Sequence, residues 1–324
     1  MNTKTLVLQA LEANKNTSIS GSALAAKLGV SRNSIWKAIN SLRNEGYQIN
    51  AGTNKGYQLA MSNDILSTEG IISELASSLK TLPLHVYDIV ESTNKTATTL
   101  AMDGALHGTT VIARGQTEGR GRRGRSFYSP KDTGVYLSVI LNPTFDISKA
   151  VLITAAAAVA VVRAIKNVTG KDAQIKWVND IYLDNKKVCG ILTEAITDFE
   201  TGQISHIIVG IGVNCRTTNF PDIANNIAGS LGGEFSRNNL VAQIINNLME
   251  LSKHLEDRQF ILEYRKYSLI IGKEINIYRT IGCKPEPAIA KDIDNNGALI
   301  VKLPNGTEEI ISTGEITIRL KGLE

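Results

Sequence analysis

The spacing of apolar residues changes twice along this 324-residue chain, and these changes constrain its fold more than any other feature. Helical spacing dominates up to about residue 60, strands alternate with helices from about residue 84 to 267, and only short strands follow Ile271. We therefore expect an α+β protein of three domains, a number that suits a chain of this length. The expected boundaries are 1–62, 63–270 and 271–324.

The first domain has the pattern of a helix-turn-helix. Residues 4–13 place apolar side chains at helical spacing and are followed by polar residues that end the element. Ser20 or Ser22 can cap a second helix, and Gly29 can form the turn that ends it. Ser31 can then cap a longer third helix.

Two short alternating segments follow the third helix. Residues 47–50 and 57–60 are joined by AGTNKG, which suits a hairpin, so the domain is predicted to be a winged helix. In helix-turn-helix proteins the second motif helix enters the major groove, and contacts to phosphates fix its position. The candidate DNA contacts are Ser31, Arg32, Asn33, Ser34, Lys37 and the wing residue Lys55, with Arg43 as a further phosphate contact. A winged helix used only for protein contacts is the alternative.

The second domain is predicted to contain a mixed or mostly antiparallel sheet, because its last strands are joined by hairpins. The expected strands are 84–90, 109–116, 134–141, 174–178, 181–192 and 206–214. Helices are expected from Ser92 or Thr93, near 147–167, over 68–80, and twice between 238 and 267. In the third domain, five short strands separated by NNG and PNG turns predict a small β-barrel.

Composition excludes several classes of protein. With 43% hydrophobic and 20% charged residues, the chain is neither disordered nor fibrous, and a formal charge of +4 says little about nucleic acid. The three cysteines lie far apart, which argues against a disulfide framework or zinc site and suits a reducing cytoplasm. Glu12 interrupts any signal peptide, and the apolar run Ala150–Val162 is too short to span a bilayer. We expect a cytoplasmic protein without a membrane segment.

The loop Gly119–Gly124, GRGRRG, matches the dinucleotide-binding pattern G-x-G-x-x-G. That pattern needs a helix to start within it, whereas here Phe127, Pro130 and a new strand follow. No Gly-Lys-Ser/Thr follows either, so a Walker loop is also excluded. Four guanidinium groups interleaved with glycines suit an anionic ligand. Taken alone, the loop is equally compatible with a solvated arginine loop or an RNA-binding patch.

Five sequence strings, in a fixed order along the chain, decide between these interpretations of the loop. EST-N, GQTEGRGRRGR, KWVNDIYL, KKVCGIL and GIGVN, at these separations, resemble the biotin protein ligases. With the winged helix, the chain resembles the bifunctional members that also repress the biotin operon, over essentially its whole length. The resemblance implies a central domain similar to class II aminoacyl-tRNA synthetases and an SH3-like C-terminal barrel. Lipoate ligases, which lack GRGRRG and the winged helix, and a small-molecule-sensing regulator without ligase activity remain alternatives.

The resemblance implies a two-step reaction. ATP and biotin form biotinyl-5'-adenylate and pyrophosphate, and a lysine of a biotin carboxyl carrier protein then takes the biotinyl group. Because the first step brings two anions together, Arg120, Arg122 and Mg²⁺ are expected to offset their repulsion. The family also implies operator DNA as a partner and a homodimer when biotinyl-adenylate is bound.

Site residues follow from the same resemblance. The biotin set is Ser92, Thr93, Asn94, Gln116, Arg120, Gly121, Arg122, Lys187 and Gly190, and the ATP set is Arg122, Arg125, Phe127, Lys176, Asn179 and Asn214. The expected catalytic residues are Arg122, Lys187 and Asp180, with Asp180 also a ligand of Mg²⁺. The downstream Gly190 match selects Lys187 over Lys186, although either could be an ordinary turn lysine. Asn179 and Asp180 could likewise be an ordinary strand end. Phe127 replaces the tryptophan common in the family, which reduces the stacking area for adenine.

Overall fold

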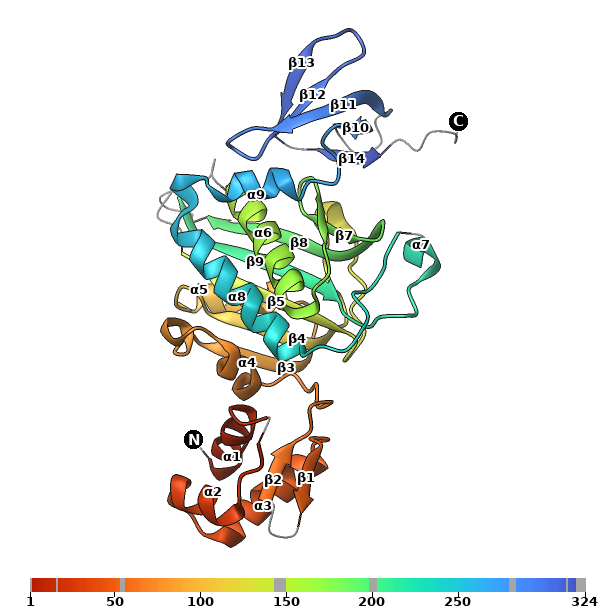
Figure 1. The fold of residues 1–324 in the computed structure, drawn as a ribbon. Helices are drawn as coiled ribbons and strands as arrows, with labels where there is room; N and C mark the ends of the chain where they lie inside the picture. The colour runs from red at the N-terminus through yellow and green to blue at the C-terminus, as the bar shows by residue number, and fades with distance from the viewer. Residues whose placement is uncertain are drawn as a thin grey trace.

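A computed structural model describes residues 2–15, 17–52, 56–142, 150–197, 203–225, 227–279, 284–312 and 314–318. Its three parts follow one another along the long axis of the molecule (Figure 1). The helical N-terminal part and the C-terminal strands lie at opposite ends, with the large central sheet and its helices between them. The three-part architecture expected from the apolar spacing is therefore present.

The N-terminal part consists of three helices and a hairpin, as predicted. The elements are α1 (Thr3–Glu12), α2 (Gly21–Leu28), α3 (Arg32–Asn44), β1 (Ile49–Gly52) and β2 (Gly56–Leu59). Ser20 and Ser31 cap α2 and α3 by accepting hydrogen bonds from backbone amides, and Gly29 ends α2 with a φ of 65°. The helices and hairpin enclose a small apolar core that includes Leu24 and Ile39.

The helix expected over residues 68–80 is shorter than predicted. α4 (Thr68–Glu74) stops because Leu75 and Ala76 adopt extended backbone, and the 3-10 turn η1 (Ser77–Leu79) follows. The amide of Ala76 donates to Asn246 Oδ1, 3.0 Å away. A hydrogen bond to a distant helix thus replaces the bond that helix continuation would have made.

The central sheet is mixed, as predicted. Its order is β3-β4-β5-β9-β8-β7-β6, and only β3 and β4 pair in parallel. The strands are β3 (Leu84–Val90), β4 (Thr110–Gln116), β5 (Gly134–Leu141), β6 (Gln174–Lys176), β7 (Asp180–Leu183), β8 (Lys186–Thr197) and β9 (Ile204–Asn214). The single strand predicted over 181–192 was wrong, because Asp184 and Asn185, with φ of 49° and 61°, form a turn that separates β7 from β8.

Helices cover both faces of this sheet. Val139 of β5 packs in one core with α6 (Ala150–Thr169) and α8 (Arg237–Lys253), whereas the next residue, Ile140, packs with α5 (Thr93–Met102). α6 is long and apolar enough to match a membrane span, but residues 155–162 are all buried inside the protein. The remaining helical elements are η2 (Arg122–Gly124), α7 (Asp222–Asn225), η4 (Leu255–Asp257) and α9 (Phe260–Lys266).

The C-terminal part is an antiparallel sheet of five strands with the order β13-β12-β11-β10-β14. The strands are β10 (Glu274–Tyr278), β11 (Glu286–Ile293), β12 (Leu299–Lys302), β13 (Glu308–Ile311) and β14 (Glu315–Ile318). Its buried residues, among them Ile275 and Val301, join the same core as the central part. The Trp177 indole donates to Gly297 O at 3.0 Å across this junction, so the two parts are packed firmly together.

Candidate active site

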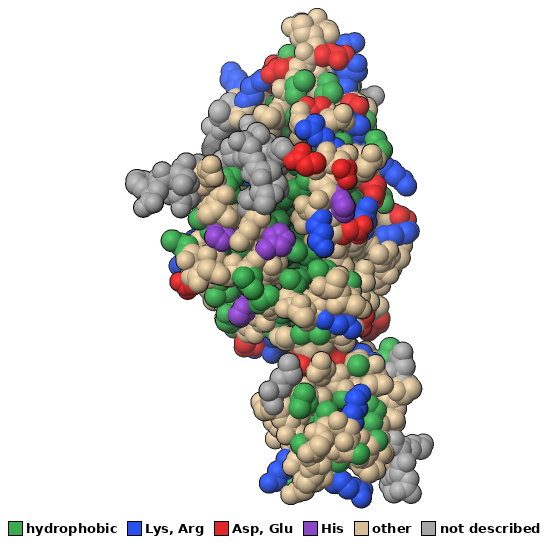
Figure 2. All heavy atoms as spheres, turned by 90° about the vertical axis from the view of Figure 1, so that its left-hand side faces the viewer, with side chains coloured by type: hydrophobic (Ala, Val, Ile, Leu, Met, Phe, Trp, Pro, Cys, Tyr) green, Lys and Arg blue, Asp and Glu red, His purple; other side chains and the backbone are tan. Residues whose placement is uncertain are grey.

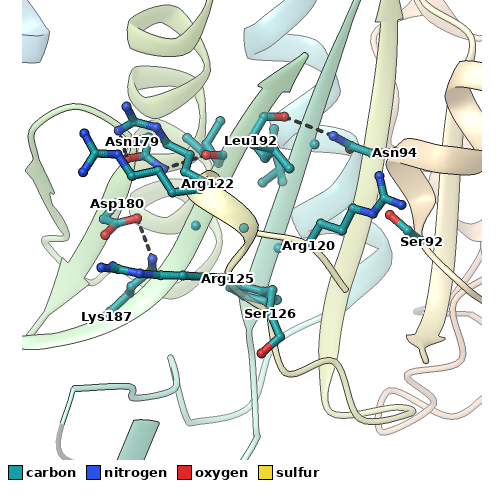
Figure 3. A pocket seen from close by; sticks show the side chains of 18 of the residues that line it. Ser92, Asn94, Arg120, Arg122, Arg125, Ser126, Asn179, Asp180, Lys187 and Leu192 are labelled. Atoms are coloured by element: carbon teal, nitrogen blue, oxygen red, sulfur yellow. Dashed lines mark hydrogen bonds and ion pairs between the residues drawn. The ribbon is translucent and has the colours of Figure 1, made fainter. Parts of the chain in front are cut away.

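One pocket collects nearly all the site residues predicted for the central domain (Figure 3). The α5 start, the arginine loop, the β6–β7 turn and strands β8 and β9 form its walls. Of the predicted residues it is lined by Ser92, Thr93, Asn94, Gln116, Arg120, Gly121, Arg122, Arg125, Phe127, Lys176, Asn179, Asp180, Lys187 and Gly190. Asn214 is the exception, because its buried side chain donates to Gly229 O at 3.1 Å and does not line the pocket.

Neutral side chains form one end of the pocket. Gln116 Oε1 accepts from the Thr93 amide at 2.8 Å and from the Thr93 hydroxyl at 3.1 Å. Gln116 Nε2 donates to Ser129 Oγ at 2.8 Å, and Ser129 in turn donates to Phe127 O at 2.9 Å. These bonds determine which end of the Gln116 amide is the acceptor. They also connect the α5 start to the base of the arginine loop.

Asn94 is held from three directions at the same end of the pocket. Its Nδ2 donates to Glu194 Oε2 at 2.6 Å and to Leu192 O at 3.3 Å, while its Oδ1 accepts from Ser138 Oγ at 2.6 Å. Both hydrogens of the Asn94 side-chain amide are therefore donated to acceptors within the protein. A Cβ on Gly210 would lie 2.0 Å from Asn94 Oδ1, so only glycine leaves room for this arrangement. Glu194, Ser138 and Gly210 were missed by the sequence analysis.

The arginine loop closes as a tight turn between extended segments. Its base pairs Phe127 N with Gly119 O at 2.7 Å, and Gly121 N donates to Arg125 O at 2.7 Å. Within the 3-10 turn η2, Arg123 has a φ of 57°. No α-helix begins in the loop, so the structure confirms that GRGRRG is not a dinucleotide fingerprint. Figure 3 shows Arg122 beside Asn179, to which its guanidinium donates at 3.2 Å.

Positive charge is concentrated toward the other end of the pocket, where Arg122, Arg125 and Lys187 lie, whereas Arg120 lies beside Ser92 and Asn94 (Figure 3). Six cationic side chains line the pocket as a whole, and Asp180 is the only carboxylate among the described residues that line it. Lys187 Nζ lies 2.6 Å from Asp180 Oδ1. The six cations are Arg120, Arg122, Arg123, Arg125, Lys176 and Lys187. Such an excess suits a ligand with several negative charges. Lys186 does not line the pocket, in agreement with the choice of Lys187.

Asp180 lies at a strand start and not, as predicted, at a strand end. β7 begins with Asp180, after a turn that contains Asn179. Asn179 is anchored because its Nδ2 donates to Ile191 O at 2.7 Å and its own carbonyl accepts from the Ile191 amide at 3.0 Å. This anchoring on β8 presents Asn179 Oδ1 to Arg122 and places Asp180 opposite Lys187 (Figure 3).

The ring of Phe127 packs against Gly190 and Gly212. A Cβ on Gly212 would meet the Phe127 ring at 2.5 Å, and one on Gly190 would meet it at 3.3 Å. Tyr136 contacts the ring edge-on, with a centroid distance of 6.4 Å. The aromatic ring is thus held at the pocket wall, which suits stacking against a planar ligand.

The C-terminal part also contributes to the pocket, which the sequence analysis did not foresee. Gly314 and Ile316 line it, and Arg123 donates to Arg279 O at 3.5 Å. Trp177 lines it as well and is tied to the C-terminal part through Gly297. No sequence signal marks Gly314, Ile316 or Arg279, because their approach depends on how two separate sheets pack; Trp177 lies in the quoted KWVNDIYL string, but its bond to Gly297 was not predicted.

The two described cysteines supply no chemistry at this site. Cys189 and Cys215 are fully buried, and burial raises the pKa of both thiols above the ordinary value. A buried thiol that stays protonated is a poor nucleophile and metal ligand. Cys283 lies outside the described residues. Within the described ranges no group of three or more His, Cys, Asp or Glu residues could hold a metal ion by itself.

The residues of the pocket could hold Mg²⁺ only together with the phosphates of a substrate. This ion keeps several waters and is commonly held by one or two carboxylates together with substrate phosphates. Asp180 can provide one carboxylate oxygen, although Lys187 shares that carboxylate. The residues present are compatible with an ion carried mainly by a phosphate-bearing substrate.

The predicted DNA contacts divide into two groups on α3. Arg32, Asn33 and Lys37 are exposed on its amino-terminal half. Ser31 Oγ instead accepts from the Ser34 amide at 3.0 Å and lies 2.9 Å from Ser34 Oγ, so both hydroxyls serve the helix cap. Lys55 lies outside the described residues. Arg43 donates to Ile49 O at 2.7 Å, and this bond links α3 to β1. The guanidinium is therefore engaged within the protein, contrary to the expected phosphate contact.

Comparisons with known proteins agree with each part of the chain. A model of the biotin/lipoate A/B protein ligase family matches residues 86–214, a helix-turn-helix domain model matches residues 3–58, and a biotin protein ligase C-terminal domain model matches residues 270–319. Along the chain the helix-turn-helix match comes first, the ligase-family match second and the C-terminal match last, and the ligase-family match contains most of the pocket.

Relatives of similar length support the same grouping. The bifunctional ligase/repressor BirA of Bacillus subtilis is 35% identical over 92% of this chain and 93% of its own length. The BirA of Escherichia coli is 30% identical over 98% of both chains. The solved biotin protein ligase of Aquifex aeolicus in complex with biotin and ATP is 25% identical, covers 73% of this chain and 98% of its own, and superposes with a TM-score of 0.61.

Proposed function

This chain belongs to the biotin protein ligase family as a bifunctional ligase/repressor, and on that premise we propose how its pocket divides the reaction among its residues. Its function is to form biotinyl-5'-adenylate from biotin and ATP, to transfer biotin to a biotin carrier protein and to repress transcription at operator DNA. The proposal rests on one observation. A single pocket is lined by neutral, hydrogen-bonded side chains at one end and by cationic side chains toward the other.

We assign the biotin ring to the neutral end. Ser92, Thr93 and Gln116 present small uncharged donors and acceptors there, which suit a polar ring without charge. Asn94 has one remaining lone pair on Oδ1 for this ring. Gly121 and Gly190 allow close approach of backbone to the ligand. This orientation directs the biotin carboxylate toward the cationic end.

The cationic end is proposed to carry the first step. A carboxylate oxygen of biotin attacks the α-phosphorus of ATP, the new oxygen–phosphorus bond forms, and the bond to pyrophosphate breaks. Arg120, Arg122 and Lys187 offset the repulsion between the two anions and stabilise the charge that builds on the phosphate oxygens. The carrier lysine then attacks the biotinyl carbonyl and AMP leaves. Asp180 holds Lys187 in position during both steps.

The nucleotide is proposed to lie against the Phe127 wall. Phe127 would stack on adenine, while Arg125, Lys176 and Asn179 lie near enough to the cationic end to meet the phosphates. Asn214 remains a proposed nucleotide contact, since its buried Oδ1 has no donor among the described residues. Mg²⁺, held by Asp180 and the phosphates of ATP, would supply further positive charge there.

Larger features are also proposed on the basis of family membership. We assign the domains to 1–62, 63–270 and 271–324, with a central fold similar to class II aminoacyl-tRNA synthetases and an SH3-like barrel at the C-terminus. The sequential antiparallel strands β10 to β13 flanked by β14 support a barrel. We further propose a cytoplasmic protein that forms a homodimer when biotinyl-adenylate is bound, because two operator half-sites require two winged helices.

The test is transfer of labelled biotin from biotin and ATP to a biotin carrier domain. Arg122→Ala and Lys187→Ala are expected to slow transfer about 100-fold or more, because each removes charge stabilisation of the transition state. Lys186→Ala serves as the matched control and should retain near wild-type transfer. Unchanged transfer in both site variants would refute the assignment of the cationic end.

An exchange assay separates the enzyme from its alternatives. Biotin should promote ATP/pyrophosphate exchange, whereas lipoate should not. Exchange with lipoate alone would indicate a lipoate ligase, and no exchange with either acid would indicate a regulator without ligase activity.

A further inference from the structure

More than half of the large aromatic side chain of Trp36 is exposed to solvent. It is 55% exposed, although its helical neighbour Ile35 is 1% exposed and Ile39 is completely buried. Tryptophan is largely buried in most folded proteins, and exposed tryptophans concentrate at interfaces, where the ring supplies contact area. The exposure of Trp36 thus marks a surface that a partner covers.

The position of Trp36 on α3 indicates what that partner is. α3 buries Ile35, Ala38, Ile39 and Leu42 against the rest of the N-terminal part. Asn33, Trp36, Lys37 and Asn40 fall on the remaining sides of the helix, at the spacing i, i+3, i+4 and i+7. Homeodomain recognition helices contact the major groove through side chains at this same spacing.

Charge along the chain favours a nucleic acid over a protein. From Ala13 to Asn44 there is no aspartate or glutamate, whereas five residues are basic. On the face drawn in Figure 2, the end of the N-terminal part farthest from the central domain shows Lys and Arg side chains and no acidic ones. The five basic residues are Lys15, Lys27, Arg32, Lys37 and Arg43; Lys15 pairs with Glu12 and Arg43 donates to Ile49 O, whereas Lys27, Arg32 and Lys37 are exposed. A duplex, with its closely spaced phosphates, is complementary to this surface.

We propose that Trp36 contacts the C5-methyl group of a thymine in the major groove of each operator half-site. The thymine methyl is the apolar group in the pattern that the four base pairs present in that groove, and the exposed face of an indole is apolar. Lys37, the next residue, lies on the same exposed side and meets a phosphate. The proposal rests on the repressor function and adds a residue that determines base preference.

The experiment first recovers a duplex from a random-sequence pool with the full-length protein, biotin and ATP. Each thymine of that duplex is then replaced in turn by deoxyuridine, which removes only the methyl group. One replacement per half-site should weaken binding of the wild-type protein about fourfold, the value for one buried methylene-sized group. Trp36→Ala should bind the unmodified duplex with a similar loss and should not respond to that replacement.

Lys37→Gln provides the matched control. It should keep the wild-type response to deoxyuridine and should reduce the slope of log K against log salt by about one per protomer. Trp36→Ala should keep the wild-type salt slope, which also shows that its winged helix remains folded. Both variants should retain biotin transfer, because neither residue lines the catalytic pocket.

Two outcomes would overturn the inference. If wild type and Trp36→Ala respond equally to every deoxyuridine replacement, or if no replacement affects either protein, Trp36 does not contact a thymine methyl. If the wild-type protein recovers no duplex from the pool while biotin transfer proceeds normally, both the DNA-binding assignment and this inference fail.

Discussion

Lys187 Nζ lies 2.6 Å from Asp180 Oδ1, so the lysine proposed for charge stabilisation is paired with the one carboxylate that lines the pocket in the described part of the chain (Figure 3). The pair joins β7 to β8 across the turn at Asp184 and Asn185. Both side chains are partly shielded from solvent, at 29% and 23% exposure, so the contact orients the ammonium group toward the site. This pairing makes the roles of the two residues interdependent.

Asp180→Asn should therefore slow adenylation and transfer by about 10- to 100-fold, the usual effect of removing a group that orients a ligand contact. Because the two residues act as a unit, combining Asp180→Asn with Lys187→Ala should cost little more than Lys187→Ala alone. Pyrophosphate exchange and carrier biotinylation measure the two steps. Asp184→Asn, in the exposed turn, is the control. Near wild-type rates in Asp180→Asn would rule out a role for this carboxylate.

The arginine loop should become more open when its contact with the sheet is removed. Arg122 donates to Asn179 Oδ1 at 3.2 Å, so Asn179→Ala should increase trypsin cleavage between Arg120 and Arg125 in the free protein. Biotin and ATP should protect the wild-type loop from cleavage, because ligand anions engage its guanidinium groups. Asn247→Ala, whose amide bonds Gln243 O elsewhere, should leave cleavage unchanged. Equal cleavage with and without ligand would contradict the proposal that the loop's guanidinium groups engage the ligand.

Two glycines of β9 should separate biotin binding from ATP binding. Gly210→Ala would displace Asn94 and should raise KM for biotin, whereas Gly212→Ala would displace Phe127 and should raise KM for ATP. Displacements of about 1 Å at a site can cost up to about 100-fold, so increases of about 10-fold or more are expected. Steady-state kinetics with each substrate varied in turn provide the measurement. An effect of both variants on the same substrate would refute the division of the pocket.

Glu194 should act by positioning Asn94. Its Oε2 accepts from Asn94 Nδ2 at 2.6 Å, and a hydrogen bond to a charged group is worth about 1.5 to 3 kcal/mol. Glu194→Ala should thus raise KM for biotin about 10-fold and leave kcat nearly unchanged, as expected for loss of uniform binding. Glu194→Gln should retain most of the affinity, because an amide oxygen can still accept. If Gln and Ala variants behave alike, or if only kcat falls, the positioning role is wrong.

Glu12 should make stability depend on pH. Its carboxylate is completely buried, 2.8 Å from Lys15, and burial raises the pKa of Glu12 above 4.5, with smaller contributions from Glu74 and Glu69. The folded state therefore binds the proton more tightly, so its stability contribution is full below pH 4.5 and is lost as pH rises through the folded pKa. Glu12→Gln should raise the urea midpoint at pH 8 more than at pH 5.

The exposed Glu45→Gln is the control for that experiment. Glu45 is 43% exposed beside Lys4, so its replacement should not produce a stabilisation that increases with pH. Denaturation followed by circular dichroism gives both midpoints. A Glu12→Gln variant that is less stable than wild type at pH 8 would show that the pair with Lys15 outweighs the cost of burial.

Local features were predicted well where neighbouring residues determine them. Ser20 and Ser31 cap helices because a hydroxyl reaches amides only a few residues away, and Gly29 forms its turn for similarly local reasons. By contrast, the helix predicted to Lys80 stops at Glu74, beside a hydrogen bond between Ala76 and Asn246. β7 and β8 were predicted as one strand over 181–192 although the polar residues 184–187 were also considered as a turn, and the structure places that turn at Asp184 and Asn185.

The candidate site shows the same division. Of the central-domain residues predicted from the ordered strings EST-N to GIGVN, all line the pocket except Asn214, whereas Gly210, Gly314 and Ile316 line it and were not predicted. Glu194 could not be predicted, because it meets Asn94 from 100 residues away. Gly210 and Gly212 were visible only as part of a string, and their importance comes from the side chains that lie over them.

The sequence by itself determined where most helices and strands lie, because periodicity, caps and turns depend on near neighbours. The residues expected in the pocket came from the resemblance carried by the ordered strings. The tertiary structure decided which partners meet. It placed Lys187 in the pocket lining and left Lys186 outside it, in line with the choice already made from the Gly190 match, because successive side chains of a strand point to opposite faces. It also joined Asn94 to Glu194 and Trp177 to Gly297, since strand pairing and sheet packing bring distant residues together.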